Sequence, residues 1–303
     1  MSGPPRLFDR ARHRLRLARA APRFADASFL KRRAAADIVE RLEAVRRDFP
    51  VAVDLGARDG TFAQALVASG AASKIGFLVE TDLAPAMLAG RAGPRVALDE
   101  EHLPFAPASL DLVVSSLALH WANDLVGALV QIRQALKPDG LFLGAILGGA
   151  TLTELRQAIT TAELELRGGA GPRVSPFADA YDAAGLLQRA GFALPVADVD
   201  RVTVRYDHVL ALIADLRAMG ETSVLVEGGD RPLTRAILLR AGEIYAERFS
   251  EGGRLIATFE ILTLTGWAPH AAQPQPLRPG TARMRLADAL GAREESAGEK
   301  AGD

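Results

Sequence analysis

Val51-Ala-Val-Asp-Leu-Gly-Ala-Arg-Asp-Gly60 decides the fold, because it is typical of a short apolar strand that runs into a glycine-containing turn. The residues that follow, Thr61 to Ser69, have the spacing of an amphipathic helix. Glycines in the turn let a ligand approach the main chain, and the unpaired amides of the first helical turn point outward. The stretch therefore predicts a small-ligand site at the junction of a strand, a turn and a helix.

Apolar segments of strand length recur after this stretch, with helical patterns between them. We expect strands at 75–79, 96–98, 110–115 and 141–147, and helices at 30–47, 61–69, 83–90 and 123–136. The segment 75–79 is apolar throughout, which favours a central parallel strand covered on both faces. The alternation of strands and helices predicts a doubly wound parallel sheet.

The pattern changes after Gly149. Helices are expected at 151–166 and 178–190, and an alternating strand at 196–206. Two more helices, 209–219 and 233–249, precede a final strand at 255–264, and we interpret them as an insertion that covers the ligand site. The predicted organisation is N-terminal helices at 1–48, an α/β domain at 49–267 with a helical cap at 208–253, and a largely flexible tail at 268–303, rich in Pro, Gln, Ala and Gly.

The composition excludes several classes of function. The 303 residues are 49% hydrophobic, enough for the core of a soluble globular protein, and the formal net charge of −1 gives no reason to expect nucleic acid or an anionic membrane as partner. Cysteine is absent, which excludes disulfides, thiolate nucleophiles and cysteine-ligated metals. The five histidines lack metal-ligand spacing, so we expect no metal site. No apolar run approaches the roughly 20 residues of a transmembrane helix.

The first 24 residues contain seven arginines between Arg6 and Arg23, with Asp9 as the one acidic residue. This composition is similar to that of a mitochondrial transit peptide. The apolar residues Leu7, Phe8, Leu15 and Leu17 also fit one face of an ordinary basic helix. We favour a helix of the mature protein, for a reason given below.

Acidic side chains follow three successive predicted strands, where the carboxyl ends of parallel strands line a ligand crevice. Asp54 and Gly56 follow the first strand, Asp82 the second, and Asp99 with Glu100 the third. An acid about 20 residues beyond a glycine turn can accept hydrogen bonds from both ribose hydroxyls, and Asp82 has that position. Asp99, one strand further on, would reach the exocyclic amine of an adenine.

Each of these assignments has an alternative. Glu80 could replace Asp82 at the ribose, and Asp82 could simply cap the following helix. Asp99 could belong to a solvated acidic loop. The spacing Gly56-x-x-x-Gly60 lacks the pattern that brings a pyrophosphate onto a helix N-terminus, which disfavours a dinucleotide. Together the residues indicate a nucleoside ligand without phosphates, namely S-adenosylmethionine.

Motifs along the chain resemble the class I S-adenosylmethionine-dependent methyltransferases, and more narrowly the branch of the malonyl carrier-protein methyltransferases of biotin synthesis. The core motifs are Asp54-Leu-Gly56, Leu103-Pro-Phe105, Leu110 to Trp121 with Asn123-Asp-Leu125, and Leu136-Lys-Pro-Asp-Gly140. Flanking motifs resemble the methyltransferase-fold assembly factor of respiratory complex I, described as an arginine hydroxylase acting on a complex I subunit. These motifs are Leu7-Phe-Asp-Arg10, Gly148 to Arg156, Ser175-Pro-Phe177, Asp215 to Glu221 and Thr265-Gly-Trp267.

The resemblance begins at Leu7, which is why we expect the first helix in the mature protein. It implies a Rossmann-like fold with a seven-stranded, mostly parallel sheet, helices on both faces and a helical insertion before the last strand. It also implies a protein substrate, a subunit of respiratory complex I, and a location in the bacterial cytoplasm or, in a eukaryote, on the mitochondrial matrix side. The residues expected to bind S-adenosylmethionine are Asp54, Gly56, Arg58, Gly60, Asp82, Leu83, Asp99, Glu100 and Ser115.

Arg58 departs from the family pattern, because the family loop usually carries a second glycine there. A side chain at this position must fit where the methionine moiety normally lies close to the backbone. Either the loop shifts slightly or Arg58 itself pairs with the carboxylate of the cofactor. We hypothesise the pairing.

The catalytic residues are not identified by the sequence. His120 and Tyr181 are candidate bases, with Tyr206 and Tyr245 as further possibilities, and His120 could equally be packed in the core. The histidines form no facial triad for iron, although hydroxylation with dioxygen normally needs a redox cofactor. Three functions stay open: arginine hydroxylation, O- or N-methyl transfer to a small or carrier-bound substrate, and a non-catalytic assembly chaperone that binds the cofactor. Arg217 and Met219 could touch the substrate or lie in solvent.

Overall fold

The computed structural model describes residues 6–227 and 232–274, together with residues 288, 291 and 293. Residues Met1–Pro269 form one compact unit and residues His270–Asp303 a second. Every helix and strand discussed below lies in the first unit, so the expected N-terminal helices and the α/β domain belong to one body. Most of the tail that we expected to be flexible lies outside the described residues.

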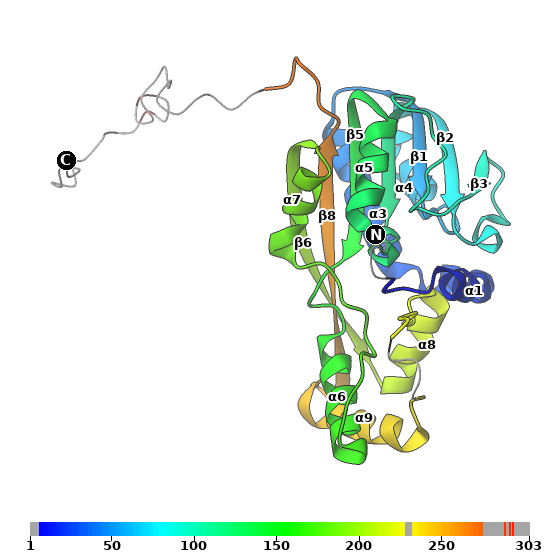
Figure 1. Ribbon diagram of the computed structural model, residues 1–303, viewed down its shortest axis with the longest axis vertical. Helices are drawn as coiled ribbons and strands as arrows, with labels where there is room; N and C mark the ends of the chain where they lie inside the picture. Colours follow the sequence, from blue (N-terminus) through cyan, green and yellow to red (C-terminus); the bar gives the residue numbers. More distant parts are fainter. Residues whose placement is uncertain (1–5, 228–231, 275–287, 289–290, 292, 294–303) are drawn as a thin grey trace, which may run out of the picture. The chain divides into compact units, whose positions relative to one another are not determined.

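One sheet forms the centre of this unit, in the strand order β3-β2-β1-β4-β5-β8-β6, with β7 paired to β8 (Figure 1). Strands β1 to β5 pair in parallel, and β8 runs antiparallel to both β5 and β6. The strands are β1 (Phe49–Leu55), β2 (Ile75–Asp82), β3 (Arg95–Ala97), β4 (Leu110–Ser116), β5 (Leu136–Leu147), β6 (Ala193–Tyr206), β7 (Ser250–Glu251) and β8 (Arg254–Trp267).

The sheet has one strand more than the seven expected. The additional strand, β7, is two residues long and forms a hairpin with the start of β8. Gly252 and Gly253 make its turn with φ of 60° and 78°, which is the backbone that tight hairpin turns require. The order of the strands reverses between β1 and β4, and that switch point is where doubly wound sheets bind ligands.

Helices cover both faces of the sheet, with α3 and α4 on one face and α5 and α7 on the other (Figure 1). The α-helices are α1 (Arg10–Ala20), α2 (Phe24–Ala27), α3 (Phe29–Ala44), α4 (Thr61–Ser69), α5 (Leu125–Ala135), α6 (Thr153–Arg167), α7 (Ala180–Arg189), α8 (Val209–Met219) and α9 (Arg235–Arg248). The 3-10 helices are η1 (Ala21–Arg23), η2 (Ala71–Lys74), η3 (Pro85–Leu88) and η4 (Leu119–Trp121).

Successive residues of the central strands point to opposite faces, as a doubly covered parallel sheet requires. Ala52 of β1 packs into the cluster that contains α3 and α4, whereas Val53 packs into the cluster that contains α5 and α7. This is why the middle of β1 and of β4 is apolar throughout rather than alternating. The expectation that the segment 75–79 is covered on both faces was wrong, because the first half of β2 is partly open to solvent and Phe77 is 51% exposed.

The helix expected at 83–90 was wrong in type, because this segment forms only the short 3-10 helix η3. Its start is fixed by Asp82, whose side chain accepts the N–H of Ala84. Gly90 and the pair Gly93-Pro94 then favour a turn into β3, so no further helical turn forms.

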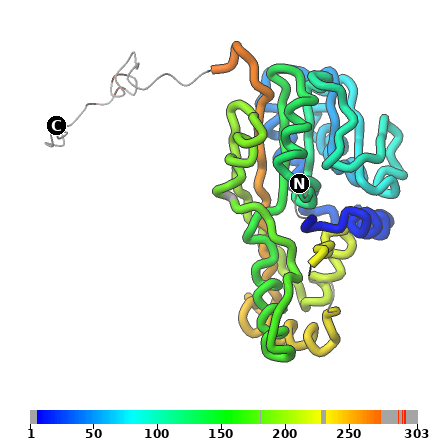
Figure 2. The backbone as a smooth tube through the Cα atoms, viewed as in Figure 1, coloured from blue at the N-terminus to red at the C-terminus, as the bar shows by residue number. Residues whose placement is uncertain are grey.

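Only half of the helical insertion borders the carboxyl ends of the strands. Helix α8 lies beside the N-terminal helix α1 (Figure 2). Gly220 at the end of α8 packs against Leu17. The segment after α8 joins the residues before α1, since Asp9 N–H donates to Val224 O at 2.9 Å. Helix α9 instead packs against α6. The expectation that both helices cover the site was therefore wrong for α9.

Candidate functional site

The turn after β1 contains two glycines with positive φ, and its main chain is packed closely against its neighbours. Gly56 and Gly60 have φ of 70° and 79°. A Cβ added at Gly56 would lie 2.3 Å from Cβ of Ala118, and one at Gly60 would lie 2.2 Å from the guanidinium of Arg91. Arg58, between them, also has positive φ, 55°. The loop therefore brings its main chain to the switch point of the sheet, as the sequence predicted.

The packing around Gly56 gives a first prediction. Gly56→Ala is expected to reduce the free energy of unfolding by about 2–4 kcal/mol, because it adds a steric clash to an unfavourable backbone conformation. Gly70→Ala is the matched control, since Gly70 has φ of 82° with nothing within 4 Å of the added Cβ. Urea denaturation measures the free energy of unfolding of the two variants, and the difference between their losses is the cost of the clash. Equal losses in both would mean that the loop moves to accommodate the methyl group.

Asp82 ends β2 in a fully buried position and is already hydrogen bonded. Its Oδ2 accepts the Arg58 N–H at 3.0 Å and Arg58 Nη1–H at 2.8 Å, and its Oδ1 accepts the N–H of Ala84. Burial alone would lower the pKa of Arg58, but the carboxylates of Asp82, Glu100 and Glu221 outweigh it and raise that pKa. Arg58 is thus a permanent cation on the carboxylate we assigned to a ribose, while its Nη2 has no partner among the described residues.

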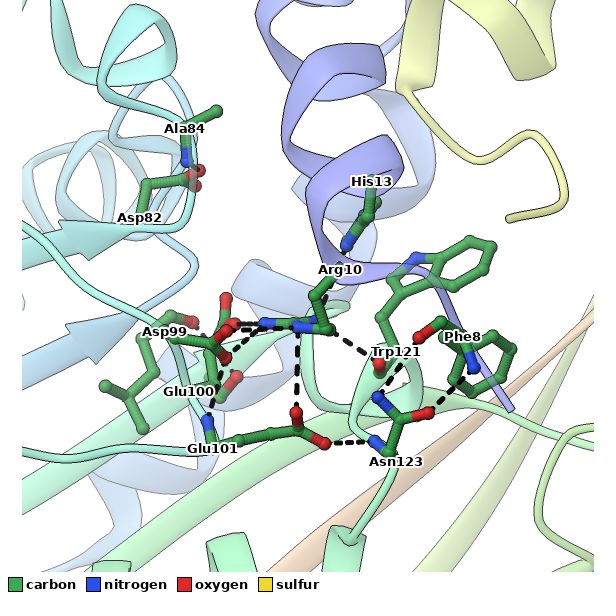
Figure 3. Close-up of polar contacts among 12 residues, drawn as sticks. Phe8, Arg10, His13, Asp82, Ala84, Asp99, Glu100, Glu101, Trp121 and Asn123 are labelled. Carbon is green, nitrogen blue, oxygen red and sulfur yellow. Dashed lines mark hydrogen bonds and ion pairs between the residues drawn. The ribbon is translucent and has the colours of Figure 1, made fainter. Parts of the chain in front are cut away.

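Arg10 of α1 occupies the acids that follow β3 (Figure 3). Its Nη2 lies 2.7 Å from Asp99 Oδ1 and also bonds Glu100, and its Nη1 donates to Trp121 O at 3.2 Å. Burial would raise the pKa of Asp99, but hydrogen bonds from Arg10 lower it. For Glu100 burial prevails and raises the pKa. Glu80, the alternative to Asp82, pairs with Arg91 at 2.8 Å.

Asp54, by contrast, has no hydrogen-bond partner for either carboxylate oxygen among the described residues, although it is fully buried. Burial raises its pKa to about 7, against an opposing attraction from Lys31. An unsatisfied buried carboxylate is unfavourable for folding, so it marks a position kept for another purpose.

Lys31 of α3 is a site residue that the sequence analysis missed. Its ammonium is buried and donates to Gly56 O at 2.7 Å, Ser116 O at 2.5 Å and Ser116 Oγ at 2.9 Å, which clamps the ends of β1 and β4 together. Burial lowers its pKa to about 8. The available signal was its place on the apolar stripe of α3, where Ile38 and Leu42 are buried.

The other predicted cofactor residues have local roles in this arrangement. Ser115 is fully buried and its Oγ donates to Leu55 O at 3.0 Å, which ties β4 to β1. Leu83 packs with Leu17 and Met87 beneath α1. The turn and the strand ends are therefore held together by these residues, and α1 joins them, which the sequence analysis did not anticipate.

His120 lies at this crevice and is held by a glutamate that the sequence analysis did not assign to the site. His120 Nε2 is 3.0 Å from Glu221 Oε2, and Trp121 Nε1–H donates to the same oxygen at 2.9 Å. Burial would raise the pKa of Glu221, but His120 and Arg58 lower it, so the carboxylate is ionised. The ring of Phe177 packs edge-on against His120 at 5.8 Å between centroids.

The candidate tyrosines are not brought together with His120. Tyr181 is 97% exposed in the first turn of α7. Tyr245 is buried in α9 and its hydroxyl donates to Ile256 O at 2.6 Å. Tyr206 is buried at the end of β6, in the same apolar cluster as α9. Of the predicted bases, His120 alone lies beside the switch point.

A channel leads from the surface to the glycine turn. Its inner part is a mainly apolar cavity lined by residues that include Lys31, Arg58 and Glu221, with a volume of about 30 Å³, room for about two water molecules. Its outer part is a groove of about 450 Å³ between α1, α6 and α8. Both parts are lined by Leu152, Phe177, Leu216 and Glu221, which we take as the neck between them.

Within the described ranges, no helix is long and apolar enough to cross a membrane. The same residues contain no group of three or more side chains suited to hold a metal ion. The side chains described above at the crevice are carboxylates, arginines, a lysine and aromatic rings.

Comparison with known proteins places this geometry in a family. A model described as "Methyltransferase domain" matches residues 53–144. The "Arginine-hydroxylase NDUFAF5, mitochondrial" of Danio rerio is 40% identical over 266 residues, which cover 86% of this chain and 81% of that protein. The "Malonyl-[acyl-carrier protein] O-methyltransferase" of Methylovorus sp. (strain MP688) is 34% identical, covering 94% of this chain and 98% of that protein.

Among solved structures, the YcgJ protein of Bacillus subtilis matches with a TM-score of 0.51 and 14% identity, over 77% of this chain and 98% of that one. A likeness at this identity concerns the fold, and it agrees with the doubly wound sheet. The relatives carry the rest of the argument, because their similarity extends over most of both chains. The chain belongs to the S-adenosylmethionine-dependent methyltransferase superfamily, in the family that includes the arginine-hydroxylase NDUFAF5 and the malonyl-[acyl-carrier protein] O-methyltransferases.

Proposed function

We propose that this protein binds S-adenosylmethionine at the carboxyl ends of β1, β2 and β4 and modifies an arginine side chain of a protein substrate. The relatives named arginine-hydroxylase make hydroxylation the leading reaction. From the resemblance in sequence, we take a subunit of respiratory complex I as the substrate. In a bacterium the protein would act in the cytoplasm.

The observation that carries the proposal is the position of Glu221 in the neck of the channel. Its Oε2 is held by His120 and Trp121, while Oε1 makes no hydrogen bond within the described part of the chain, and Phe177 lines the same neck. An ionised carboxylate beside an aromatic ring is a combination that binds a guanidinium through charge-assisted hydrogen bonds and cation–π attraction. A substrate arginine entering the channel would meet this pair first.

The residues at the strand ends fit the cofactor chemically. Asp82 and Asp99 would hold the nucleoside hydroxyls and amine, and the free Nη2 of Arg58 would hold the carboxylate of the methionine moiety. When bound, the cofactor would supply a sulfonium-activated methyl group, which serves the methyl-transfer alternative; hydroxylation would in addition consume dioxygen and two electrons from an external reductant. Arg58 pairs with Asp82 and Arg10 with Asp99, the two carboxylates that the cofactor would contact, and the inner cavity is small. Cofactor binding therefore requires both arginines to exchange partners.

Arg58 supplies a direct test of the cofactor site. Arg58→Ala is expected to weaken the affinity for S-adenosylmethionine about tenfold, because it removes the buried cation that would pair with the carboxylate. Isothermal titration calorimetry of the full chain measures this. Arg33→Ala is the control, since Arg33 pairs with Asp200 on the surface, away from the strand ends. Unchanged affinity in Arg58→Ala would remove the pairing from the proposal.

The reaction is tested by intact-mass analysis of candidate partner proteins from cells with and without this gene. A loss of 16 Da from one partner, mapped to an arginine, is expected when the gene is absent. A loss of 14 Da would replace hydroxylation with methyl transfer, the reaction of the O-methyltransferase relatives. No mass change, with the partner still bound, would favour a non-catalytic assembly role.

A further inference from the structure

The mouth of the channel carries an uncompensated positive charge. Four arginines line the outer groove, Arg12 and Arg16 from α1, Arg173 from the loop after α6, and Arg217 from α8. Arg173 is paired with the buried Glu163 at 2.5 Å. The other three have no such partner: within the described part of the chain, no carboxylate of another element lies within ion-pair distance of them.

The three remaining arginines differ from those elsewhere on the surface. Arg12 contacts only Asp9 of its own helix cap, at 3.6 Å, and Arg16 Nη1 donates to the neutral Thr222 Oγ1 at 2.5 Å. Arg217 is exposed and has no ion pair among the described residues. Elsewhere, surface arginines commonly reach a carboxylate on a distant element, for example Arg33 with Asp200, Arg41 with Asp198, Arg205 with Glu251 and Arg240 with Glu165.

The charge is also concentrated along α1 itself. Arg12 and Arg16 are four residues apart, so they lie on one face of the helix with Arg19 three residues further on. Like charges at this spacing destabilise a helix by a few tenths of a kcal/mol per pair. The pKa of Arg16 is lowered, first by burial and then by Arg12 and Arg19. Two of these three like charges, Arg12 and Arg16, line the outer groove, in a protein whose net charge is only −1.

We propose that Arg12, Arg16 and Arg217 form a docking rim for an acidic segment of the protein substrate, next to the arginine that enters the channel. The rim and the neck are complementary in charge to such a segment, because the rim is positive and Glu221 in the neck is negative. Electrostatic complementarity of this kind sets the register and the association rate of a complex. The inference rests on the proposed function only in naming the docked protein as the substrate.

The shape of the site favours a chain segment over a lipid surface. The arginines line a concave groove together with Thr222, Ser223 and Glu227. A bilayer surface cannot follow a groove into a channel, and the carboxylates of Glu221 and Glu227 would face its anionic headgroups. An extended acidic peptide can place its own charges on the rim and keep them away from both glutamates.

The test uses the full chain and two fluorescent peptides, each with one central arginine and flanked by either glutamates or serines. We expect the glutamate peptide to bind at least tenfold more tightly in fluorescence anisotropy, with a preference that falls as salt is raised from 50 to 300 mM, as screening requires. The triple variant Arg12→Gln, Arg16→Gln, Arg217→Gln should lose that preference. The control variant Arg46→Gln, Arg95→Gln, Arg189→Gln removes the same charge from exposed positions outside the groove and should keep it.

Two results would overturn the docking rim. One is equal binding of both peptides to the unchanged protein. The other is a triple variant that loses affinity for phosphatidylglycerol vesicles but keeps its affinity for the glutamate peptide. That result would make the rim a membrane contact. The binding assay needs no cofactor or turnover. Rim-dependent peptide binding without any modified partner in the intact-mass experiment would therefore contradict the proposed function and leave the docking rim standing.

Discussion

Glu221→Gln is expected to lower kcat/KM for modification of the protein substrate about 100-fold, with the affinity for S-adenosylmethionine changed by less than twofold. The glutamine keeps the size of the side chain and can still accept one hydrogen bond from His120 or Trp121. It loses the negative charge that the neck offers to a guanidinium. Hydrogen bonds to charged groups are worth about 1.5–3 kcal/mol, which corresponds to roughly 10- to 150-fold.

The measurement is the initial rate of the mass change on the partner identified by intact-mass analysis, as a function of its concentration. Glu227→Gln is the matched control, because Glu227 is an exposed carboxylate on the same groove outside the neck. It should keep activity within twofold. If both variants lose activity equally, the carboxylate acts through the general charge of the groove, and Glu221 has no specific role.

Asp54→Asn is expected to stabilise the protein at pH 8 by about 1–3 kcal/mol and to weaken cofactor binding. The environment disfavours the ionised form of Asp54, first through burial and then through the neighbouring carboxylates, against the attraction of Lys31. A raised pKa means that ionising Asp54 in the folded protein costs free energy, and a neutral side chain of the same shape avoids that cost. The loss of attraction to Lys31 reduces the gain below the full value that the pKa shift implies.

The gain should depend on pH in a defined direction. The pKa of Asp54 is about 7 in the folded protein and 3.8 as the ordinary value. Between these values the folded state holds the proton more tightly than the unfolded state, so stability falls as pH rises from about 4 to 7. The unfavourable ionisation is complete above pH 7. Chemical denaturation should therefore show the largest advantage of Asp54→Asn at pH 8, shrinking steadily toward pH 5.

Asp82→Asn, at an equally buried aspartate, is expected to have the opposite effect and destabilise the protein. Its carboxylate accepts hydrogen bonds from Arg58 and Ala84, so removing its charge takes from the buried Arg58 the carboxylate that it is hydrogen bonded to. Destabilisation by both substitutions at pH 8 would show that the Asp54 carboxylate has favourable partners after all. A stabilised Asp54→Asn with normal cofactor affinity would remove Asp54 from the binding site while leaving the stability argument intact.

The Arg10 and Arg58 pairings link cofactor binding to the position of α1. Arg10 joins Asp99, Glu100 and Trp121, and α1 is in turn joined to the segment after α8 (Figure 3). Exchange of Arg10 from these carboxylates would loosen the helix that carries part of the docking rim. The proposed cofactor site and the proposed substrate groove would thus share α1.

Much of this fold was predictable because its signals are local. The helix expected at 61–69 is α4, Thr61–Ser69, and the helix expected at 209–219 is α8, Val209–Met219. Apolar runs identified the strands, since each buried strand must be apolar on both faces whatever its partners are. The acids at the strand ends could be grouped for the same reason, because parallel strands end at one edge of the sheet.

The partners of those acids could not be predicted. Arg10 and Asp99 are 89 residues apart, and His120 and Glu221 are 101 apart. Such pairs form only after helices pack onto the sheet, and no periodicity in the sequence records which helix reaches which strand end. A lysine on the apolar stripe of α3 was only a weak sign that Lys31 belongs to the site. The sequence of α9 contained no sign that this helix packs on α6 instead of covering the site.

The sequence by itself determined most of the strands, the glycine turn, the family resemblance and the four carboxylates at the strand ends, because each depends on local spacing or on motifs. Only the tertiary structure decided that arginines pair with three of those carboxylates, that Asp54 stays unsatisfied, and that Glu221 stands in the neck of the channel. The physical reason is that buried charges must find counter-charges within the fold, and that choice is made by the packing of distant elements.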